Sequence, residues 1–250
     1  MNNPQNIPGK TRGIILHIFP YNDTCNILHI YTEDFGKASF IATKHRSRKN
    51  KKPGNIFVPL TIHSIEIQTA KHNHGSSMMR IRETKPEAPL QNISSNPLKV
   101  TIALFLSEII LRTIREGEPD PRLFNFLRHT VYTLETSATG IANFHIAFLI
   151  RLLDHLGLSP RISSYTEGSR FDMLEGLFTS GRISHPYELS PDHSRILRDL
   201  LRIDYRNMSR FSFSRNDRVL ILNKTIEYYR LHLPHISDIK SLAVLQAIFN

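Results

Sequence analysis

The stretch GIILHIFPYNDTCNILHIYTEDFGKASFIA, residues 13–42, sets the expectation for the fold. Residues 13–19, 25–31 and 37–42 are short runs rich in β-branched and aromatic side chains, which are typical of β-strands. Between the first two, residues 20–23 combine Pro, Asn and Asp and predict a turn. The second turn, 33–36, ends at a glycine that can adopt the positive φ of a tight hairpin. The stretch therefore predicts three strands joined by tight turns.

Strand signals continue to about residue 82. Residues 56–62 form a β-like run, and residues 62–68 alternate with one interruption after Ser64, which indicates a bulge. Residues 78–82 form a last short strand. Five short strands (13–19, 25–31, 37–42, 62–68 and 78–82) with turn chemistry between them predict a small barrel of the OB type.

Beyond the strands, the pattern changes to helices. Residues 85–97 contain three prolines and no periodicity, which is typical of a linker. Apolar residues then recur at helical spacing, and Pro97, Gly157, Ser190 and Ser214 are expected at helix ends. The predicted helices cover residues 100–115, 121–134, 139–156, 191–203, 215–231 and 242–249.

These patterns predict an α+β protein with an N-terminal OB-fold β-barrel followed by an all-α helical C-terminal domain. The predicted divisions are an OB domain at 1–84, a Pro-rich linker at 85–97 and a helical domain at 98–250. Residues 158–189 interrupt the helical pattern and are expected to form an irregular insertion within the helical domain.

Charge is distributed unevenly along the chain. The sequence has 32 Lys and Arg against 22 Asp and Glu, a net charge of +10. Residues 1–90 hold 13 basic and 6 acidic residues, whereas residues 91–250 hold 19 and 16. One cysteine, Cys25, excludes an intramolecular disulfide and fits a reducing compartment. With no signal-peptide pattern and no apolar stretch long enough to span a bilayer, we expect a soluble, cytoplasmic protein without membrane contact.

Most of the excess charge lies in residues 44–52, KHRSRKNKK, which contain no acidic and no apolar residue. Such a segment has no face to bury and is expected to form a solvated loop between strands. Its clustered charge favours a polyanion, most often nucleic acid. The alternative is a loop that only aids solubility. We call residues 44–52 the basic segment.

No catalytic or nucleotide-binding signature occurs. Walker A, Gly-rich dinucleotide and His-Glu-x-x-His motifs are absent, as is a Gly-x-Ser-x-Gly elbow. His72 and His74 flank one residue but lack a third ligand nearby, so no metal site is expected. Glu116, Glu118 and Asp120 suit helix capping rather than catalysis. The chain is therefore predicted to be a non-enzyme without a cofactor.

Binding chemistry remains. OB-type barrels hold single strands with basic residues along the phosphates and aromatic residues against the bases. The aromatic candidates are Tyr21, Tyr31, Phe35 and Phe40, although strand aromatics also serve as core residues.

The helical part contains a second basic set, Arg195, Arg198, Arg202, Arg206, Arg210, Arg215 and Arg218, of which the first three share one helical face. This set could be a nucleic-acid track, a pocket for an acidic peptide or a solvated face. The interleaved Asp192, Asp199 and Asp204 favour the solvated face.

Several segments together resemble the RecO family of bacterial recombination mediators, as found in Bacteroidetes. In the N-terminal part these are KTRGIIL, YNDT, YTEDFGK, the basic segment and FVPL, at residues 10–16, 21–24, 31–37, 44–52 and 57–60. In the helical part they are IALFLSE, ANFH, FDMLEG and YYRLH, at residues 102–108, 142–145, 171–176 and 228–232. The resemblance covers nearly the whole chain and depends on the order of these segments.

The resemblance implies binding of single- and double-stranded DNA, annealing of complementary strands, and loading of RecA. It also implies two partners, RecR and the acidic C-terminal tail of single-strand binding protein. Together with the residue patterns it gives the predicted DNA-binding set Lys44, Arg46, Arg48, Lys49, Lys51, Lys52, Lys37, Arg12, Tyr31 and Phe35. The rival interpretations are a generic OB-fold RNA-binding protein and an adaptor that binds no nucleic acid.

The chain departs from the family pattern in two places. Many members carry four zinc-binding cysteines near residues 158–189, and this chain has none there. Either apolar residues such as Leu177 and Phe178 replace the metal, or the segment is looser. His45 stands where a glycine is usual, which changes the shape of the basic segment but not its charge.

Overall fold

The computed structural model describes residues 9–44, 57–68, 78–236 and 238–249. The chain forms two compact units, Met1–Glu135 and Thr136–Asn250. The first unit contains β1 (Lys10–Pro20), β2 (Cys25–Thr32), β3 (Gly36–Thr43), β4 (Ile62–Ile67), β5 (Met79–Pro86), α1 (Gln91–Ser95), α2 (Pro97–Thr113) and α3 (Pro121–Thr136), whose last residue opens the second unit. The second contains α4 (Ile141–Leu156), β6 (Arg170–Asp172), β7 (Leu177–Thr179), β8 (Glu188–Leu189), α5 (Pro191–Leu200), α6 (Arg215–His232) and α7 (Ser241–Phe249), with short 3₁₀ helices at Ile162–Ser164 and Met208–Arg210.

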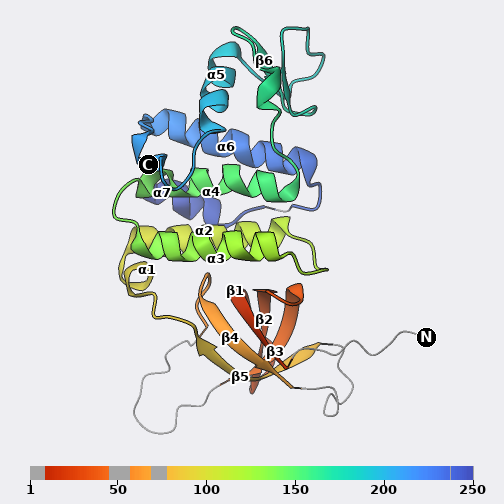
Figure 1. The fold of residues 1–250 in the computed structure, drawn as a ribbon, viewed down its shortest axis with the longest axis vertical. Helices are drawn as coiled ribbons and strands as arrows, with labels where there is room; N and C mark the ends of the chain where they lie inside the picture. Colours follow the sequence, from red (N-terminus) through yellow and green to blue (C-terminus); the bar gives the residue numbers. More distant parts are fainter. Residues whose placement is uncertain (1–8, 45–56, 69–77, 237, 250) are drawn as a thin grey trace, which may run out of the picture. The chain divides into compact units, whose positions relative to one another are not determined.

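The five strands of the first unit form a closed barrel in the order β1-β2-β3-β5-β4 (Figure 1). All neighbouring strands are antiparallel except β3 and β5, which pair in parallel. This arrangement is that of an OB-type barrel. The predicted α+β class, with an N-terminal OB barrel followed by helices, is confirmed.

Alternating side chains of the strands fill the barrel, as the period of two in a strand requires. Each buried aliphatic or aromatic side chain contributes about 1.5–3 kcal/mol relative to leaving it exposed. The buried core consists of Ile15, Leu28, Ile30, Phe40, Ala42, Phe57, Ile65, Ile67 and Ile81.

Two local predictions for the barrel were wrong. Among the described residues 57–61 no strand forms; Leu60 has a positive φ of 64°, and its N–H donates to the carbonyl of Ile15 at 2.7 Å. Phe57 supplies a buried ring from this turn, so its apolar character reflects burial rather than strand pairing. The bulge of β4 lies between Glu66 and Ile67, not after Ser64.

The linker is more ordered than its composition suggests. Strand β5 runs to Pro86 and α1 lies within residues 85–97. Both carboxylate oxygens of Glu135 accept from the N–H groups of Asn92 and Ile93 at 2.8 Å and so cap the start of α1. Helices α1, α2 and nearly all of α3 belong to the same compact unit as the barrel. Helix α2 contacts β1, α1 contacts α2, and Phe124 of α3 stacks on Tyr31 of β2. The domain bounds 1–84, 85–97 and 98–250 stay a prediction.

The helix ends follow the predicted chemistry. Asn96 caps α2 with Pro97 at the first helical position. Ser190 caps α5, and Ser214 forms a capping box with Asp217 at α6. Gly157 ends α4 in the left-handed conformation, with φ 69°.

The segment predicted to be irregular contains a small three-stranded sheet in the order β7-β6-β8. Strands of two or three residues are too short to show a period in the sequence, so the sheet was not predicted. Phe171 and Phe178 are 1% and 3% exposed, and their ring centroids lie 4.9 Å apart. This apolar contact supports the first alternative, in which apolar packing takes the place of a metal.

His63 on β4 is fully buried. Its Nε2 lies 3.1 Å from Thr61 Oγ1 and its Nδ1 lies 3.0 Å from Thr84 Oγ1. Burial lowers the pKa of His63 to about 4, against an ordinary value near 6.5. The folded state therefore keeps this ring neutral at pH values where the unfolded chain binds a proton.

We predict that stability falls as the pH drops from about 6.5 to about 4, because the unfolded state then binds one proton more at this site. The expected loss is about 3 kcal/mol. Urea unfolding at several pH values, compared with a His63→Gln variant that cannot titrate, isolates the contribution. Equal pH dependence in both proteins would show that His63 contributes nothing.

Candidate nucleic-acid interface

The basic segment begins at one end of the barrel. Residues 45–52, which include five of its six cations, lie outside the described residues. Lys44 is described, and its Nζ donates to the backbone carbonyl of Asn22 at 2.6 Å. Asn22 belongs to the turn between β1 and β2, and its Oδ1 accepts from the N–H groups of Thr24 and Cys25. Lys44 therefore holds the start of the basic segment beside this turn.

Arg80 on β5 adds a second cation at the same end. Its Nη1 lies 3.8 Å from the sulfur of Cys25. The pKa of the Cys25 thiol is lowered, first by a hydrogen bond from Thr24 and then by the positive charges of Arg80 and Lys44. Lys44 is held next to Cys25 by its backbone, because its N–H donates to the carbonyl of Thr24 at 2.7 Å. Cys25 itself is a buried side chain, 7% exposed.

Arg12, a predicted DNA-binding residue, is engaged within the protein. Its guanidinium donates to both carboxylate oxygens of Glu33 at 2.8 and 2.7 Å, and it lies 5.7 Å from the centroid of the Phe124 ring. Glu87 lies within 3.8 Å as well. Because two carboxylates offset its charge, Arg12 contributes little to a field that attracts phosphate.

Lys37 and Tyr31 are engaged by residues of α2 and α3. Lys37 Nζ donates to the carbonyl of Leu111 at 2.8 Å, and burial lowers the pKa of this ammonium. Tyr31 is 1% exposed, stacks on Phe124 with ring centroids 6.4 Å apart, and has its pKa raised to about 12 by burial. Neither residue is presented to a nucleic acid in this structure.

The other two aromatic candidates in β3 and its turn also face inward. Phe40 is fully buried in the barrel core, and Phe35 packs partly buried against the same core. The structure therefore does not offer Tyr31, Phe35 or Phe40 for stacking on bases. Strand aromatics were considered equally suited to a core, and the core interpretation holds for Phe40.

The outer face of β2 and β3 is covered along half of its length. Because Leu28, Ile30 and Phe40 point inward, strand alternation places His29, Tyr31, Lys37 and Ser39 outside. Ser39 donates to Glu116, and Lys37 forms a backbone bridge with Glu116. Gly36 lies so close to Gly117 that a Cβ there would be 2.6 Å from the Gly117 carbonyl oxygen. We call this region, contacted by residues 111–124, the covered half.

The opposite end of the same face is exposed. Tyr21 is 57% exposed and Phe19 is 44% exposed. Residues 21–24 and Thr43 are exposed as well. We call residues 19–24, 43–44 and Arg80 the open end. Tyr21 is one of the candidates from the sequence, whereas Phe19 is not, because the sequence places Phe19 in a strand but does not show whether its ring is exposed.

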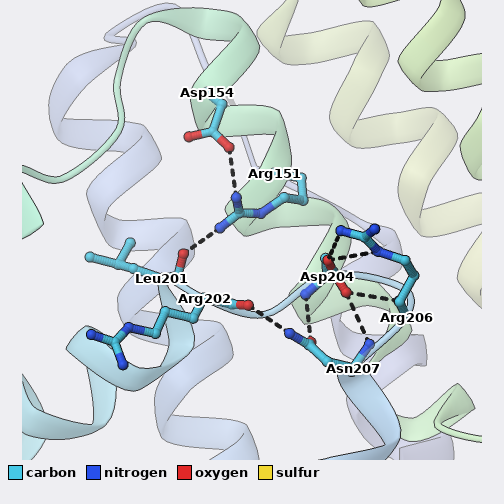
Figure 2. A network of polar contacts seen from close by, with 7 residues as sticks. All are labelled: Arg151, Asp154, Leu201, Arg202, Asp204, Arg206 and Asn207. Atoms are coloured by element: carbon cyan, nitrogen blue, oxygen red, sulfur yellow. Dashed lines mark hydrogen bonds and ion pairs between the residues drawn. The ribbon is translucent and has the colours of Figure 1, made fainter.

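Aspartates offset the charge of some arginines of the second unit. Figure 2 shows Arg206 against Asp204, whose other oxygen accepts from the N–H groups of Arg206 and Asn207. Arg198 pairs with Asp199 at 2.7 Å and lies 4.8 Å above the Tyr165 ring. The interpretation as a balanced face is confirmed for these two arginines. Within the described residues, no carboxylate pairs with Arg195 or Arg202.

The possible metal site and possible membrane-spanning helices can be checked for the described residues. His72 and His74 lie outside them. Among the residues that the structure describes, no three His, Cys, Asp or Glu side chains are arranged to hold a metal ion. No described helix is both long and apolar enough to cross a membrane.

The fold and this interface define the chain as an OB-barrel protein with a basic end, joined to a helical region. Comparison with known proteins is more specific. Residues 7–87 match the family model Recombination protein O N terminal, and residues 94–243 match Recombination protein O C terminal. The chain belongs to the RecO family of DNA repair proteins.

The similarity to curated relatives extends over nearly the whole length of this chain. The protein named DNA repair protein RecO from Bacteroides fragilis is 42% identical over 242 residues, which is 96% of this chain and 99% of the relative. Proteins of the same name from Phocaeicola vulgatus and Flavobacterium psychrophilum are 39% and 31% identical, each over 96% of this chain and 99% of the relative. The resemblance noted from the sequence is confirmed.

Proposed function

We propose that this chain is a DNA-binding recombination mediator. In this proposal it binds single- and double-stranded DNA, anneals complementary strands, and with RecR helps to load RecA onto DNA covered by single-strand binding protein. One observation carries the proposal. The 42% identity to a protein named DNA repair protein RecO extends over 96% of the chain, barrel and helices together.

The proposed DNA contact is the basic segment with its six cations Lys44, Arg46, Arg48, Lys49, Lys51 and Lys52. Two features support it: the surplus of basic residues within residues 1–90, and the placement of both Lys44 and Arg80 at the open end. Arg12, Lys37, Tyr31 and Phe35 are not part of the proposed contact, because each is engaged or partly buried within the protein.

The proposed mechanism needs no nucleotide. Two complementary strands repel each other through their phosphates, and a dense cluster of cations lowers that repulsion. Pairing itself then supplies the free energy for annealing. The proposal includes no catalytic step. The proposed location is the cytoplasm at the nucleoid, and the proposed protein partners are RecR and the acidic tail of single-strand binding protein.

The experiment that tests this function measures binding and annealing by the full chain. Fluorescence anisotropy is expected to give a log–log salt slope of roughly −4 with a labelled single strand and roughly −5 with a duplex, for six phosphate contacts. Annealing of two complementary oligonucleotides, followed by energy transfer between end labels, is expected to accelerate without ATP. A flat salt response, or binding without faster annealing, would contradict the proposal.

The same assays distinguish the rival classes. Tighter binding to structured RNA than to single-stranded DNA would favour an RNA-binding protein. Absence of binding to either nucleic acid, with RecR still bound, would favour an adaptor.

A further inference from the structure

We propose that Phe19 and Tyr21 form a short platform on which unpaired bases stack, and that base stacking is confined to this open end of the barrel. The inference rests on the proposed function and specifies how that function treats a strand. A strand held mainly by its phosphates and stacked at one short site keeps most of its bases free to pair.

The first observation is the exposure of two aromatic rings. Among the described residues of the first unit, Phe19 and Tyr21 are the exposed large aromatic side chains, at 44% and 57%. Phenylalanine has no polar group that gains from contact with water, so leaving it exposed at a strand end costs hydrophobic free energy. A ring at such a position is available to a partner with a flat apolar face.

The second observation is that the Phe19 ring is held in place. Its centroid lies 4.2 Å from that of His17 at an interplanar angle of 77°, and 5.2 Å from that of His29 at 90°. Both are edge-to-face contacts, the arrangement that aromatic pairs prefer. His29 is fixed in turn by a 2.9 Å hydrogen bond with Ser39. Stacking on a ring already held by its neighbours loses little side-chain entropy.

The third observation is the charge around the two rings. Lys44 is bonded to Asn22 in the turn that begins with Tyr21, and Arg80 lies against Cys25 at the end of that turn. Asp23 is the one carboxylate among residues 19–24. Aromatic rings with cations beside them are the combination that holds single strands by stacking and phosphate contact.

The fourth observation sets the length of the platform. OB-type barrels use the face of strands 2 and 3 for oligonucleotides, and here the covered half of that face is occupied by residues 111–124. Tyr31 lies under Phe124, and the Lys37 ammonium is bonded to Leu111. A strand at this barrel therefore meets exposed aromatic rings at the open end and none on the covered half.

The test compares bases with phosphates. The full chain is titrated into labelled oligo-dT, into an abasic oligonucleotide of equal length and charge, and into a duplex. Base–aromatic stacking is worth about 1–3 kcal/mol per base, so the wild type is expected to prefer oligo-dT over the abasic strand by about 10-fold or more. A variant with Phe19→Leu and Tyr21→Leu is expected to lose this preference, with its affinity for the abasic strand and its salt slope unchanged.

Two control variants and one further measurement complete the design. Tyr187→Leu removes an exposed ring of the second unit, 37% exposed, and is expected to leave the preference intact. Phe19→Tyr retains a ring and is expected to behave as the wild type, which separates stacking from a folding defect. Annealing by the double variant at saturating protein is expected to stay within about 2-fold of the wild type, because phosphate contacts remain.

Two outcomes would overturn the inference while leaving the proposed function intact. One is a wild type that binds oligo-dT and the abasic strand equally; the other is a double variant that keeps the preference for oligo-dT. Loss of annealing in the double variant would overturn the statement that annealing uses the bases that are not stacked on the protein. Absence of binding to every DNA would overturn the proposed function itself.

Discussion

Changing Lys44, Arg46, Arg48, Lys49, Lys51 and Lys52 to Ser is expected to remove most of the affinity for DNA. Six phosphate contacts correspond to a log–log salt slope of roughly −4 for a single strand and −5 for a duplex. Without them the salt dependence is expected to flatten to a slope between about −1 and 0. The affinity at about 50 mM salt is expected to fall by roughly 10²–10³-fold. Anisotropy titrations at several salt concentrations measure both quantities.

A matched variant distinguishes a local field from net charge. Arg161, Arg195, Arg202, Arg206, Arg210 and Arg215 are exposed arginines of the second unit. Changing these six to Ser removes the same total charge. This control is expected to retain most of the affinity and slope, because its six charges are spread over residues 161–215 instead of being clustered in nine consecutive residues, and separated surface charges are screened at 0.1 M salt. Equal losses in the two variants would mean that overall charge, rather than the basic segment, governs binding. Circular dichroism verifies that both variants fold.

Gly36→Ala is expected to cause a large loss of stability in the first unit. Gly36 has φ 62°, where a side chain costs about 1–2 kcal/mol. Its Cβ would also lie 2.6 Å from the Gly117 oxygen and 2.8 Å from the Glu118 oxygen, and overpacking of this kind costs about 1–3 kcal/mol. The sum predicts a decrease of about 2–5 kcal/mol in the free energy of unfolding, measured by urea denaturation.

Gly168→Ala separates the two causes. Gly168 has φ 79°, but a Cβ there would meet nothing within 4 Å. Its substitution is expected to cost about 1–2 kcal/mol, the conformational part alone. If Gly36→Ala costs no more than Gly168→Ala, the close approach of residues 117 and 118 to the barrel contributes nothing to stability. That outcome would also weaken the case for the covered half.

Local features of this protein could be read from its sequence because each depends on neighbouring residues. Gly36 takes the positive φ expected of its turn, and Ser214 caps the helix that begins at Arg215. The barrel strands show a period of two, and the helices are long enough to show their period. The order of segments also indicated the RecO family. The three-residue strands β6 and β7 escaped notice because they are shorter than any detectable period.

The sequence by itself determined the barrel, the helices, the concentration of charge in the basic segment and the family. Which candidate residues remain accessible was decided by the tertiary structure. The sequence predicts three binding residues that the folded chain engages internally. Phe124 lies against Tyr31, Leu111 binds Lys37, and Glu33 binds Arg12. The sequence places Phe19 in a strand, and only the structure shows that its ring is exposed. The physical reason is that local pattern fixes which face of a strand a side chain occupies, whereas its exposure depends on what distant parts of the chain pack against that face.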